Sequence, residues 1–288
     1  MHRPARAIAV AALGLLAACG APEALPDTPP LTVATFNVRY VSARDGLDDW
    51  RARAPAVGDA VDDLDADLIA VQEMETFDGG HSSDRNVQLD YVLGEFRDYR
   101  AAATGDPSAY PSTQPVLYRP DRLAPIDQGF FFFSPTPDRI YARPWHGRYP
   151  AFASWVRFKD RASGIGFLVV NVHLDARNAR DRVKSARLVV ERIEAIGRDD
   201  EPVVVLGDFN APVFFPTMRI LARSGLRRAP ALGATFHFGS GIRLLPAIDH
   251  VLGSDTVAFE RADIVRTAYA GTLPSDHYPV RARIRFKR

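Results

Sequence analysis

The sequence predicts one α+β domain, of the α/β type, in which strands and helices follow each other along most of the chain. Short apolar runs bounded by turn residues indicate buried strands, and residues 203–206 are the clearest example. Residues 177–197 carry apolar side chains at helical spacing and end at Gly197, which predicts a helix. Residues 31–288 contain no internal repeat and no linker, so we expect a single domain.

The composition is typical of an ordinary globular protein, with 47% hydrophobic and 25% charged residues. The chain has 36 basic and 35 acidic residues. Without Arg3 and Arg6, 34 basic residues remain against 35 acidic ones, a formal net charge of −1. Bulk charge therefore gives no indication of a polyanion-binding protein. The densest basic cluster lies in the predicted helix 177–197, where a solvated helix face explains it: Arg177, Arg180, Arg182 and Arg187.

The first 18 residues are typical of a secretory signal peptide, because two arginines precede an uncharged apolar run over residues 7–18. The run ends in Leu-Ala-Ala-Cys19, which resembles the bacterial lipobox, where the cysteine is lipidated and becomes the mature N-terminus. Residues 19–30 contain four prolines and are expected to form an extended tether. We therefore expect an exported lipoprotein of the bacterial cell envelope, anchored to a membrane by Cys19. A non-lipidated signal peptide cut nearby is the alternative.

The first half of the domain alternates between strand and helix patterns. Residues 31–40 are strand-like with Asn37 near their end, residues 51–64 have helical spacing, and residues 67–73 form a second apolar strand that ends in Glu73. A short helix is expected over 87–96, and strands near 115–118 and 128–133. The irregular segment 134–149, which contains Arg148, is long enough to line a site.

The second half places polar residues at the ends of further strands. Residues 151–158 and 165–174 indicate a hairpin that ends near His173, and the strand 203–206 leads through Gly207 to Asp208 and Asn210. If the backbone stays extended there, both of these side chains point the same way. Turn hydrogen bonds are the alternative role for this Asp and Asn.

The C-terminal quarter predicts a short helix over 217–223 and strands over 247–252, 256–267 and 278–286. Asp249 lies on the first of these strands, and Asp276 and His277 immediately precede the last. Apolar residues and arginines alternate along 278–286, which fits a strand with one face in the core and one face in water.

Polar side chains thus occur at or just past the ends of six successive β-segments. Carboxylate and amide oxygens are the ligands of hard cations, which favours Mg²⁺, or Mn²⁺ in its place, over Zn²⁺. The pattern predicts such a cation site beside an acid–base histidine. Its members are Asn37, Glu73, His173, Asp208 with Asn210, Asp249, and Asp276 with His277.

Six segments occur in an order and spacing that resemble the endonuclease/exonuclease/phosphatase superfamily: TFNVRY, LIAVQE, NVHLD, VVLGDFN, AIDHV and PSDHYPV. The resemblance covers essentially all of residues 31–288. It implies a four-layered α-β-β-α sandwich, in which two packed mixed β-sheets are covered by outer helices. It also implies metal-dependent hydrolysis of a phosphoester.

The resemblance also implies roles for the matching residues. Glu73 is expected to be the principal metal ligand, with Asn37 and Asp276 nearby. His277 is expected to act as the acid–base group, oriented by Asp249, and Asp208 to hold or deprotonate the attacking water. Asn210 and His173 are expected to donate to the non-bridging phosphoryl oxygens.

One part of the pattern departs from bacterial secreted members of the family. They have an arginine where this chain has Ala151, and Arg148 is the candidate replacement at a substrate contact. His237 also resembles a family position near the site, with a structural hydrogen bond as the alternative.

The expected function is a lipid-anchored, Mg²⁺-dependent phosphoesterase that acts as a monomer on a small phosphoester or a lipid head group. A nonspecific nuclease is the alternative enzyme, so nucleic acid remains an open substrate. A catalytically silent domain that binds phosphorylated ligands is the alternative from another class.

Overall fold

The computed structural model describes residues 26–287 apart from 42–45, 75–76, 79–80 and 83–85. The expected signal peptide 1–18, Cys19 and most of the expected tether 19–30 lie outside the described residues. At the end of that tether segment, the Thr28 hydroxyl donates to the carbonyl of Phe286 on the last strand. Among the described helices, none combines the length and the apolar character needed to cross a bilayer.

Two six-stranded sheets form the centre of the molecule. The first has the order β13-β14-β1-β2-β6-β5, with bounds β13 (Val257–Ile264), β14 (Val280–Phe286), β1 (Leu31–Asn37), β2 (Leu68–Gln72), β6 (Val116–Tyr118) and β5 (Arg100–Ala102). The second has the order β11-β12-β10-β9-β8-β7, with bounds β11 (Arg227–Arg228), β12 (Asp249–Gly253), β10 (Val203–Asp208), β9 (Gly166–His173), β8 (Phe152–Asp160) and β7 (Leu123–Phe132). A separate two-stranded ribbon consists of β3 (Phe77–Asp78) and β4 (His81–Ser82).

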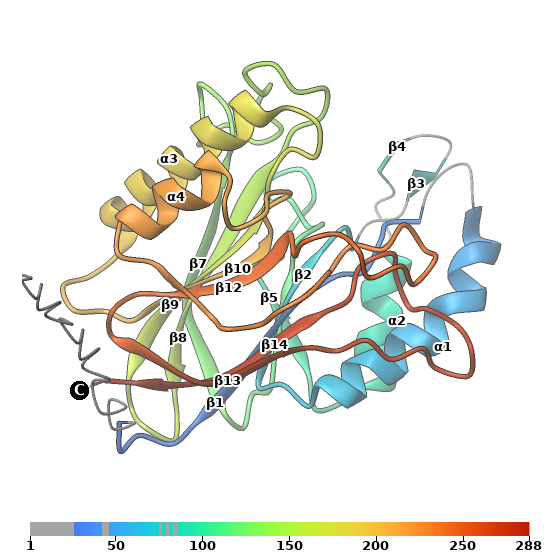
Figure 1. The fold of residues 1–288 in the computed structure, drawn as a ribbon, viewed down its shortest axis with the longest axis horizontal. Helices are drawn as coiled ribbons and strands as arrows, with labels where there is room; N and C mark the ends of the chain where they lie inside the picture. The colour runs from blue at the N-terminus through green and yellow to red at the C-terminus, as the bar shows by residue number, and fades with distance from the viewer. Residues whose placement is uncertain (1–25, 42–45, 75–76, 79–80, 83–85, 288) are drawn as a thin grey trace, which may run out of the picture.

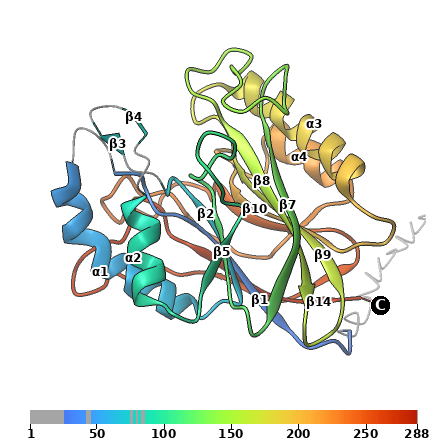
Figure 2. The same ribbon diagram turned by 180° about the vertical axis from the view of Figure 1, so that it is seen from behind.

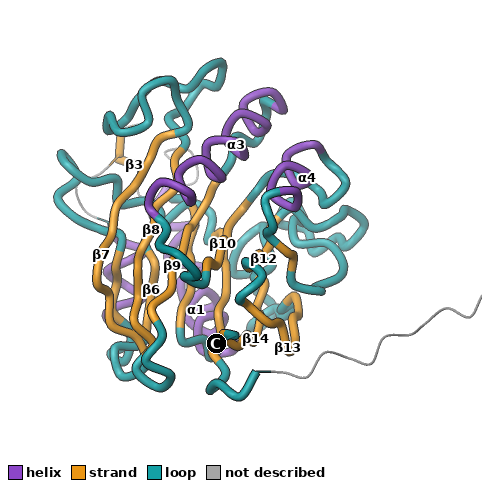
Figure 3. Tube along the Cα trace, turned by 90° about the vertical axis from the view of Figure 1, so that its left-hand side faces the viewer, coloured by secondary structure: helices purple, strands orange, loops and turns teal. Residues whose placement is uncertain are grey.

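Helices cover the outer face of each sheet. Helices α1 (Gly46–Leu64) and α2 (Val87–Glu95) lie against the first sheet, and α3 (Ala179–Ile196) and α4 (Pro216–Arg223) lie against the second (Figures 1 and 2). Figure 3 shows α3 and α4 running along the outer side of β8, β9, β10 and β12. Both sheets are mixed, because β1 pairs parallel to β2 but antiparallel to β14, and β10 pairs parallel to β9 but antiparallel to β12. The expected sandwich of two mixed sheets with flanking helices is confirmed.

The core has three layers, one between the sheets and one beneath each pair of helices. On β1, Val33 faces the other sheet while Ala34 and Phe36 face the helices. A central strand covered on both sides needs apolar residues on both faces, which explains the unbroken apolar run of β10. On β14, by contrast, residues 280, 282, 284 and 286 are buried and the arginines between them lie on the other face, as their alternation predicts.

Element bounds differ from the sequence predictions mainly at ends and edges. Helix α1 starts five residues earlier than expected (residue 46 rather than 51) and contains Pro55, and β7 begins at residue 123 rather than 128. Helix α3 starts after Asn178, whose side chain accepts hydrogen bonds from the N–H groups of Arg180 and Asp181. The short strands β5 and β11 were not expected, because two or three residues carry no periodicity and form a strand only through pairing with a neighbour.

Candidate functional site

The candidate site lies where strand ends of the two sheets meet. In the first sheet, Asn37 ends β1 and Glu73 follows β2, its parallel neighbour. In the second sheet, Asp208 ends β10 and is the register partner of both His173 on β9 and Asp249 on β12. The tertiary fold therefore brings together polar residues that are far apart in the chain, such as Asn37 and Asp208, which are 171 positions apart.

Three of these residues form a buried cluster, which we call the inner triad: Asp208, Asp249 and His277. Their exposed fractions are 1%, 2% and 5%. The Nδ1 atom of His277 lies 2.9 Å from Asp249 Oδ2, and its Nε2 atom lies 3.8 Å from Asp208 Oδ2. This imidazole is thus oriented by one carboxylate and aimed at another, the arrangement that an acid–base histidine requires.

Burial and neighbouring charges shift the pKa values of His277 and Asp208 in the inner triad. Burial alone would lower the pKa of His277, but the negative charges of Asp249 and Asp208 outweigh it and raise that pKa well above its usual value. Burial, reinforced by the charge of Asp249, raises the pKa of Asp208, while the two histidines oppose the shift. The two carboxylates therefore favour the protonated form of the His277 imidazole.

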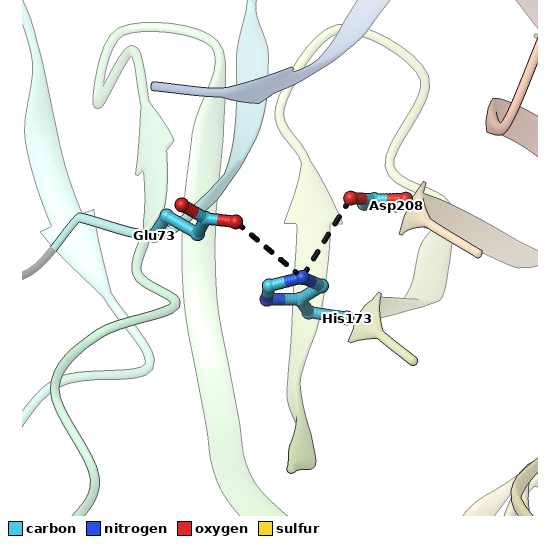
Figure 4. Close-up of side chains that lie close together, drawn as sticks. All are labelled: Glu73, His173 and Asp208. Carbon is cyan, nitrogen blue, oxygen red and sulfur yellow. Dashed lines mark ion pairs between the residues drawn. The ribbon is translucent and has the colours of Figure 1, made fainter. Parts of the chain in front are cut away.

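Two partly exposed residues, which we call the outer pair, lie on the solvent side: Glu73 and His173. The Nε2 atom of His173 is 3.7 Å from Glu73 Oε1 and 3.6 Å from Asp208 Oδ2 (Figure 4). Figure 4 shows the two carboxylates on either side of this ring. The side chains of Glu73 and His173 are 21% and 25% exposed, so solvent reaches this edge of the site.

The donor set fits a divalent cation. Two groups of acidic and histidine residues place their donor atoms within 4.8 Å of one another, Glu73 with His173 and Asp208, and the inner triad. Convergent carboxylates repel each other unless a positive charge lies between them. Hard oxygen donors are also the ligands that Mg²⁺ or Mn²⁺ prefers.

Asn37 and Asp276, the two other expected ligands, lie at the margin of this cluster. The Asn37 amide nitrogen donates to Glu73 Oε1 (3.0 Å) and Asp208 Oδ2 (3.2 Å), and its oxygen accepts from the N–H of Arg39. Asp276 belongs to neither of the two groups of convergent donors among the described residues. Its Oδ1 atom lies 3.3 Å from the hydroxyl of Ser275, which in turn donates to the carbonyl of Asn37.

The turn after β10 differs from the extended geometry expected from the sequence. Asn210 has a φ of 48°, in the left-handed region, so its side chain and that of Asp208 do not simply share one face of a strand. The Asn210 N–H donates to Asp208 Oδ1, and its side-chain amide donates to the carbonyl of Leu174. The alternative of turn hydrogen bonds is thus observed, and the turn fixes the Oδ1 atom of Asp208 while Asn37 donates to its Oδ2 atom.

Two backbone features near the site require unusual conformations. Glu73 has a φ of 57°, which turns its carboxylate back toward β1. Gly207 has a φ of 147°, and a Cβ atom there would lie 1.9 Å from the carbonyl oxygen of Val172 on β9. Only glycine permits this approach of β10 to β9, which sets the spacing between Asp208 and His173.

The two expected substrate contacts lie in different surroundings. His237 is fully buried, its Nδ1 accepts from the N–H of Gly241, and its ring packs on Tyr278, so its observed contacts are structural. Burial lowers its pKa. Arg148 is exposed and lies over the ring of Tyr149. Its neighbour Gly147 packs so closely on the Asp175 side chain that a Cβ would meet it at 2.4 Å, which places this loop beside the strand end of His173.

Sequence reasoning missed a buried arginine that joins two segments of the site. Arg53 of α1 is 4% exposed, and its guanidinium donates to the carbonyls of Val38 (2.6 Å) and Pro274 (3.1 Å). It also donates to the carbonyl of Arg39 and pairs with Asp49. Arg53 thereby ties the segment after Asn37 to the segment before Asp276 and His277. One arginine on a helix carries no signal of this role in the sequence.

A second missed feature is a polar bridge between the two sheets, directly beneath the site. Gln72 donates to Asn171 Oδ1 (2.7 Å) and accepts from the hydroxyl of Thr35, and all three side chains are fully buried. Asn171 also donates to the carbonyl of Val71. A buried amide inside an apolar strand needs such a partner, so Gln72 and Asn171 within otherwise apolar runs were the available signal.

A family model described as Endonuclease/Exonuclease/phosphatase family matches residues 34–277, a span that contains every candidate site residue from Asn37 to His277. A comparison with curated protein sequences gives no significant match.

Solved structures share the fold over nearly their whole length. A mannosyl-6-phosphatase from Bacteroides thetaiotaomicron is 26% identical with a TM-score of 0.78, over 89% of this chain and 100% of that chain. An endonuclease/exonuclease/phosphatase family protein from the same organism is also 26% identical with a TM-score of 0.78, over 90% and 99%. The catalytic domain of human nocturnin with a bound sulfate anion is similar in fold alone, at 17% identity and a TM-score of 0.66, over 91% and 97%.

Proposed function

Because the chain belongs to the endonuclease/exonuclease/phosphatase family, we propose that it is a divalent-metal-dependent phosphoester hydrolase. The observation that carries this proposal is the convergence of Glu73, His173 and Asp208 beside the His277–Asp249 pair. All the polar positions that the reaction needs are filled. This completeness weighs against a catalytically silent phosphate-binding domain.

Glu73 would hold the cation, with Asn37 and Asp276 nearby, and Mg²⁺ or Mn²⁺ suits these oxygen donors. When bound, a divalent cation supplies polarisation of the phosphoryl group and stabilisation of the leaving oxygen. Asp208 holds the attacking water, since its carboxylate lies between His173 and His277 and its raised pKa suits a proton acceptor. His277, oriented by Asp249, carries the acid–base step. His173 and Asn210 donate to the non-bridging phosphoryl oxygens.

The metal requirement is tested with purified protein and a chromogenic phosphoester. Excess chelator should abolish hydrolysis, and Mg²⁺ or Mn²⁺ should restore it. Full activity in excess chelator would disprove the metal-dependent reaction.

The preferred substrate class is a small or membrane-borne phosphoester, and a nuclease is the second candidate. The formal net charge of −1 for the chain without its N-terminal arginines supports the first, because an extended grip on nucleic acid needs many cations. The rate should therefore depend weakly on salt, and duplex DNA should be a poor substrate. DNA cleaved far faster than small esters, with affinity falling steeply as salt rises, would favour the nuclease.

For the location, we propose an acylated Cys19 that anchors the domain to a membrane of the bacterial envelope, on the basis of the lipobox-like residues before it. Position 20 is Gly rather than Asp, so retention at the inner membrane by that signal is not expected. Metabolic labelling with a fatty acid should mark wild-type protein but not Cys19→Ser. A Cys19→Ser protein that stays membrane-bound, or an unlabelled wild type, contradicts the anchor.

A further inference from the structure

Large apolar side chains are exposed on two loops that leave the second sheet beside the inner triad. Of the eleven large hydrophobic residues exposed in the described part of the chain, six lie on these loops. We call this set the apolar rim: Val213, Phe214, Phe238, Ile242, Leu244 and Leu245. Phe238 is 66% exposed and Leu244 is 88% exposed. Single exposed apolar residues are common, but a concentration of them next to a site marks a binding surface.

A chain of aromatic contacts connects the apolar rim to the candidate acid–base group. The ring of His277 lies 4.8 Å from that of Phe236, and the ring of Phe236 lies 4.4 Å from that of Phe238. Phe236 and His277 also form a β-bridge, and the N–H of His237 donates to the carbonyl of Asp276. The loop that carries Phe236 and Phe238 therefore forms part of the wall of the site.

The backbone holds Phe238 in a conformation that a bulky residue rarely adopts. Its φ is 54°, in the left-handed region, and such strain persists only where the surrounding contacts impose it. The buried His237 supplies those contacts, because its ring accepts from the N–H of Gly241 and its carbonyl accepts from the hydroxyl of Ser240. The turn thus presents the Phe238 ring to solvent while its neighbour is locked in the interior.

The second loop of the rim starts at the same strand ends. The N–H of Phe209 donates to the carbonyl of Ile248, and His250 Nε2 lies 3.0 Å from the carbonyl of Ala211. The segment that carries Val213 and Phe214 therefore departs next to the point where the Phe238 loop returns to β12.

The chemistry of both loops favours an uncharged hydrocarbon as their partner. Residues 209–217 contain no charged residue, and residues 236–248 contain no acidic residue and one arginine, Arg243. A strand of nucleic acid would need several cations along its phosphates, and its bases would stack on aromatic rings and not on leucine or isoleucine. Four of the six rim residues are aliphatic, which suits an alkyl chain.

We propose that the apolar rim binds the alkyl part of the substrate, so that the preferred substrate is a phosphoester that carries a hydrocarbon chain. This inference rests on the proposed phosphoester hydrolysis and names the substrate class of that same site. Each methylene that leaves water contributes about a fourfold preference, so a chain that lies partly on the rim gives about tenfold or more.

The test compares two chromogenic diesters that share a p-nitrophenyl leaving group and differ only in the second group, ethyl or octyl, below the concentration at which the octyl ester forms micelles. The ratio of kcat/KM for octyl over ethyl should be about ten or more in the wild type. Phe238→Asn, in which Asn tolerates the left-handed backbone, and Leu244→Ser should each bring the ratio toward one. Ile126→Ser, which removes a 54% exposed apolar side chain from β7, is the matched control and should leave the ratio unchanged.

A wild-type ratio near one, or an equal loss in the Ile126→Ser control, overturns the proposal. So does a rim variant that loses binding to phosphatidylcholine vesicles while it keeps the octyl preference, because the rim would then dock on a bilayer. A single-stranded DNA oligonucleotide cleaved faster than either ester, with a rate lowered by the rim variants, also overturns it.

If neither diester is cleaved, the proposed function fails but the rim is still tested. Calorimetry then compares ethyl phosphate with octyl phosphate as ligands. Octyl phosphate should bind about tenfold more tightly than ethyl phosphate, and this preference should be lost in Phe238→Asn and kept in Ile126→Ser. That result would support alkyl binding by the apolar rim independently of hydrolysis. Equal binding of the two ligands rejects it.

Discussion

The inner triad and the outer pair use the same kinds of residue in different surroundings. Asp208, Asp249 and His277 are at most 5% exposed, whereas the side chains of Glu73 and His173 are more than 20% exposed. In the triad, burial and neighbouring charges shift the pKa values of Asp208 and His277 strongly. The outer pair lies at the solvent edge, where a cation and a substrate can enter.

In the proposed reaction, this difference would separate proton transfer from ligand binding within one site. A buried imidazole between two carboxylates has a fixed orientation, and the two negative charges favour its protonated form. A partly exposed carboxylate can exchange water for a cation. Changes in the inner triad should therefore affect the chemical step. In the outer pair, changes at Glu73 should affect the metal requirement, and changes at His173 should affect the contact with the phosphoryl oxygens.

The largest effect is expected from the inner triad. His277→Ala should lower kcat by about two to four orders of magnitude, because His277 is the described histidine that groups with both Asp208 and Asp249. Steady-state kinetics at saturating Mg²⁺, with circular dichroism as the check on folding, measure this effect. A folded variant with near-normal turnover would remove His277 from the acid–base role.

The next largest effect is expected from Arg53 of α1, which ties the segment after Asn37 to the segment before His277. Arg53→Met should reduce the free energy of unfolding by about 2–3 kcal/mol, because the buried carbonyls of Val38 and Pro274 lose a charged donor. Urea unfolding measures the change. Arg53→Lys keeps the charge but not the forked geometry and should fall between wild type and Arg53→Met. Unchanged midpoints in both variants would show that Arg53 does not hold these segments together.

A smaller effect is expected at the outer pair. Glu73→Gln should raise the Mg²⁺ concentration for half-maximal activity by about 10- to 100-fold, because one negative ligand becomes neutral. Titration of activity with Mg²⁺ measures it. Glu260→Gln is the matched control, since Glu260 pairs with Arg283 and Arg285 at the other end of β14. An equal shift in the control, or no shift in Glu73→Gln, would separate Glu73 from the cation.

The smallest effect is expected from His250, the neighbour of Asp249 on β12, as a loss of stability at low pH. His250 is buried, and desolvation lowers its pKa to about 4, so its neutral Nε2–H donates to the carbonyl of Ala211. The unfolded chain binds this proton near pH 6.5. The contribution to stability is therefore complete above pH 6.5 and is lost as pH falls from 6.5 toward 4, by roughly 1 to 1.5 kcal/mol at pH 5.5.

The control for this loss is His250→Gln, which keeps a donor at the same place without titrating. Urea unfolding at pH 7.5 and pH 5.5 should show a larger difference for wild type than for His250→Gln. Equal differences would mean that His250 is not the group responsible.

The sequence by itself determined the strands and helices of one α+β domain and most residues of the candidate site, and its resemblance to the family implied the two-sheet sandwich. The apolar run of β10, the alternation of β14 and the helical spacing of α3 are local patterns, because the period of a strand or helix places every side chain relative to its neighbours in the chain. Polar residues at strand ends stand out against such patterns. That is why Asn37, Glu73, His173, Asp208, Asp249 and His277 could be named before their contacts were known.

Only the tertiary structure decided which of these residues meet and what holds them. The bond from Asn37 to Asp208 and the contacts of Arg53 with Pro274 join positions 171 and 221 residues apart, and no local period encodes such distances. The left-handed turn at Asn210 and the short strands β5 and β11 likewise depend on neighbours that pack from elsewhere in the chain. Local burial is periodic and can be predicted from residue order, whereas the choice of partner depends on how two whole sheets pack against each other.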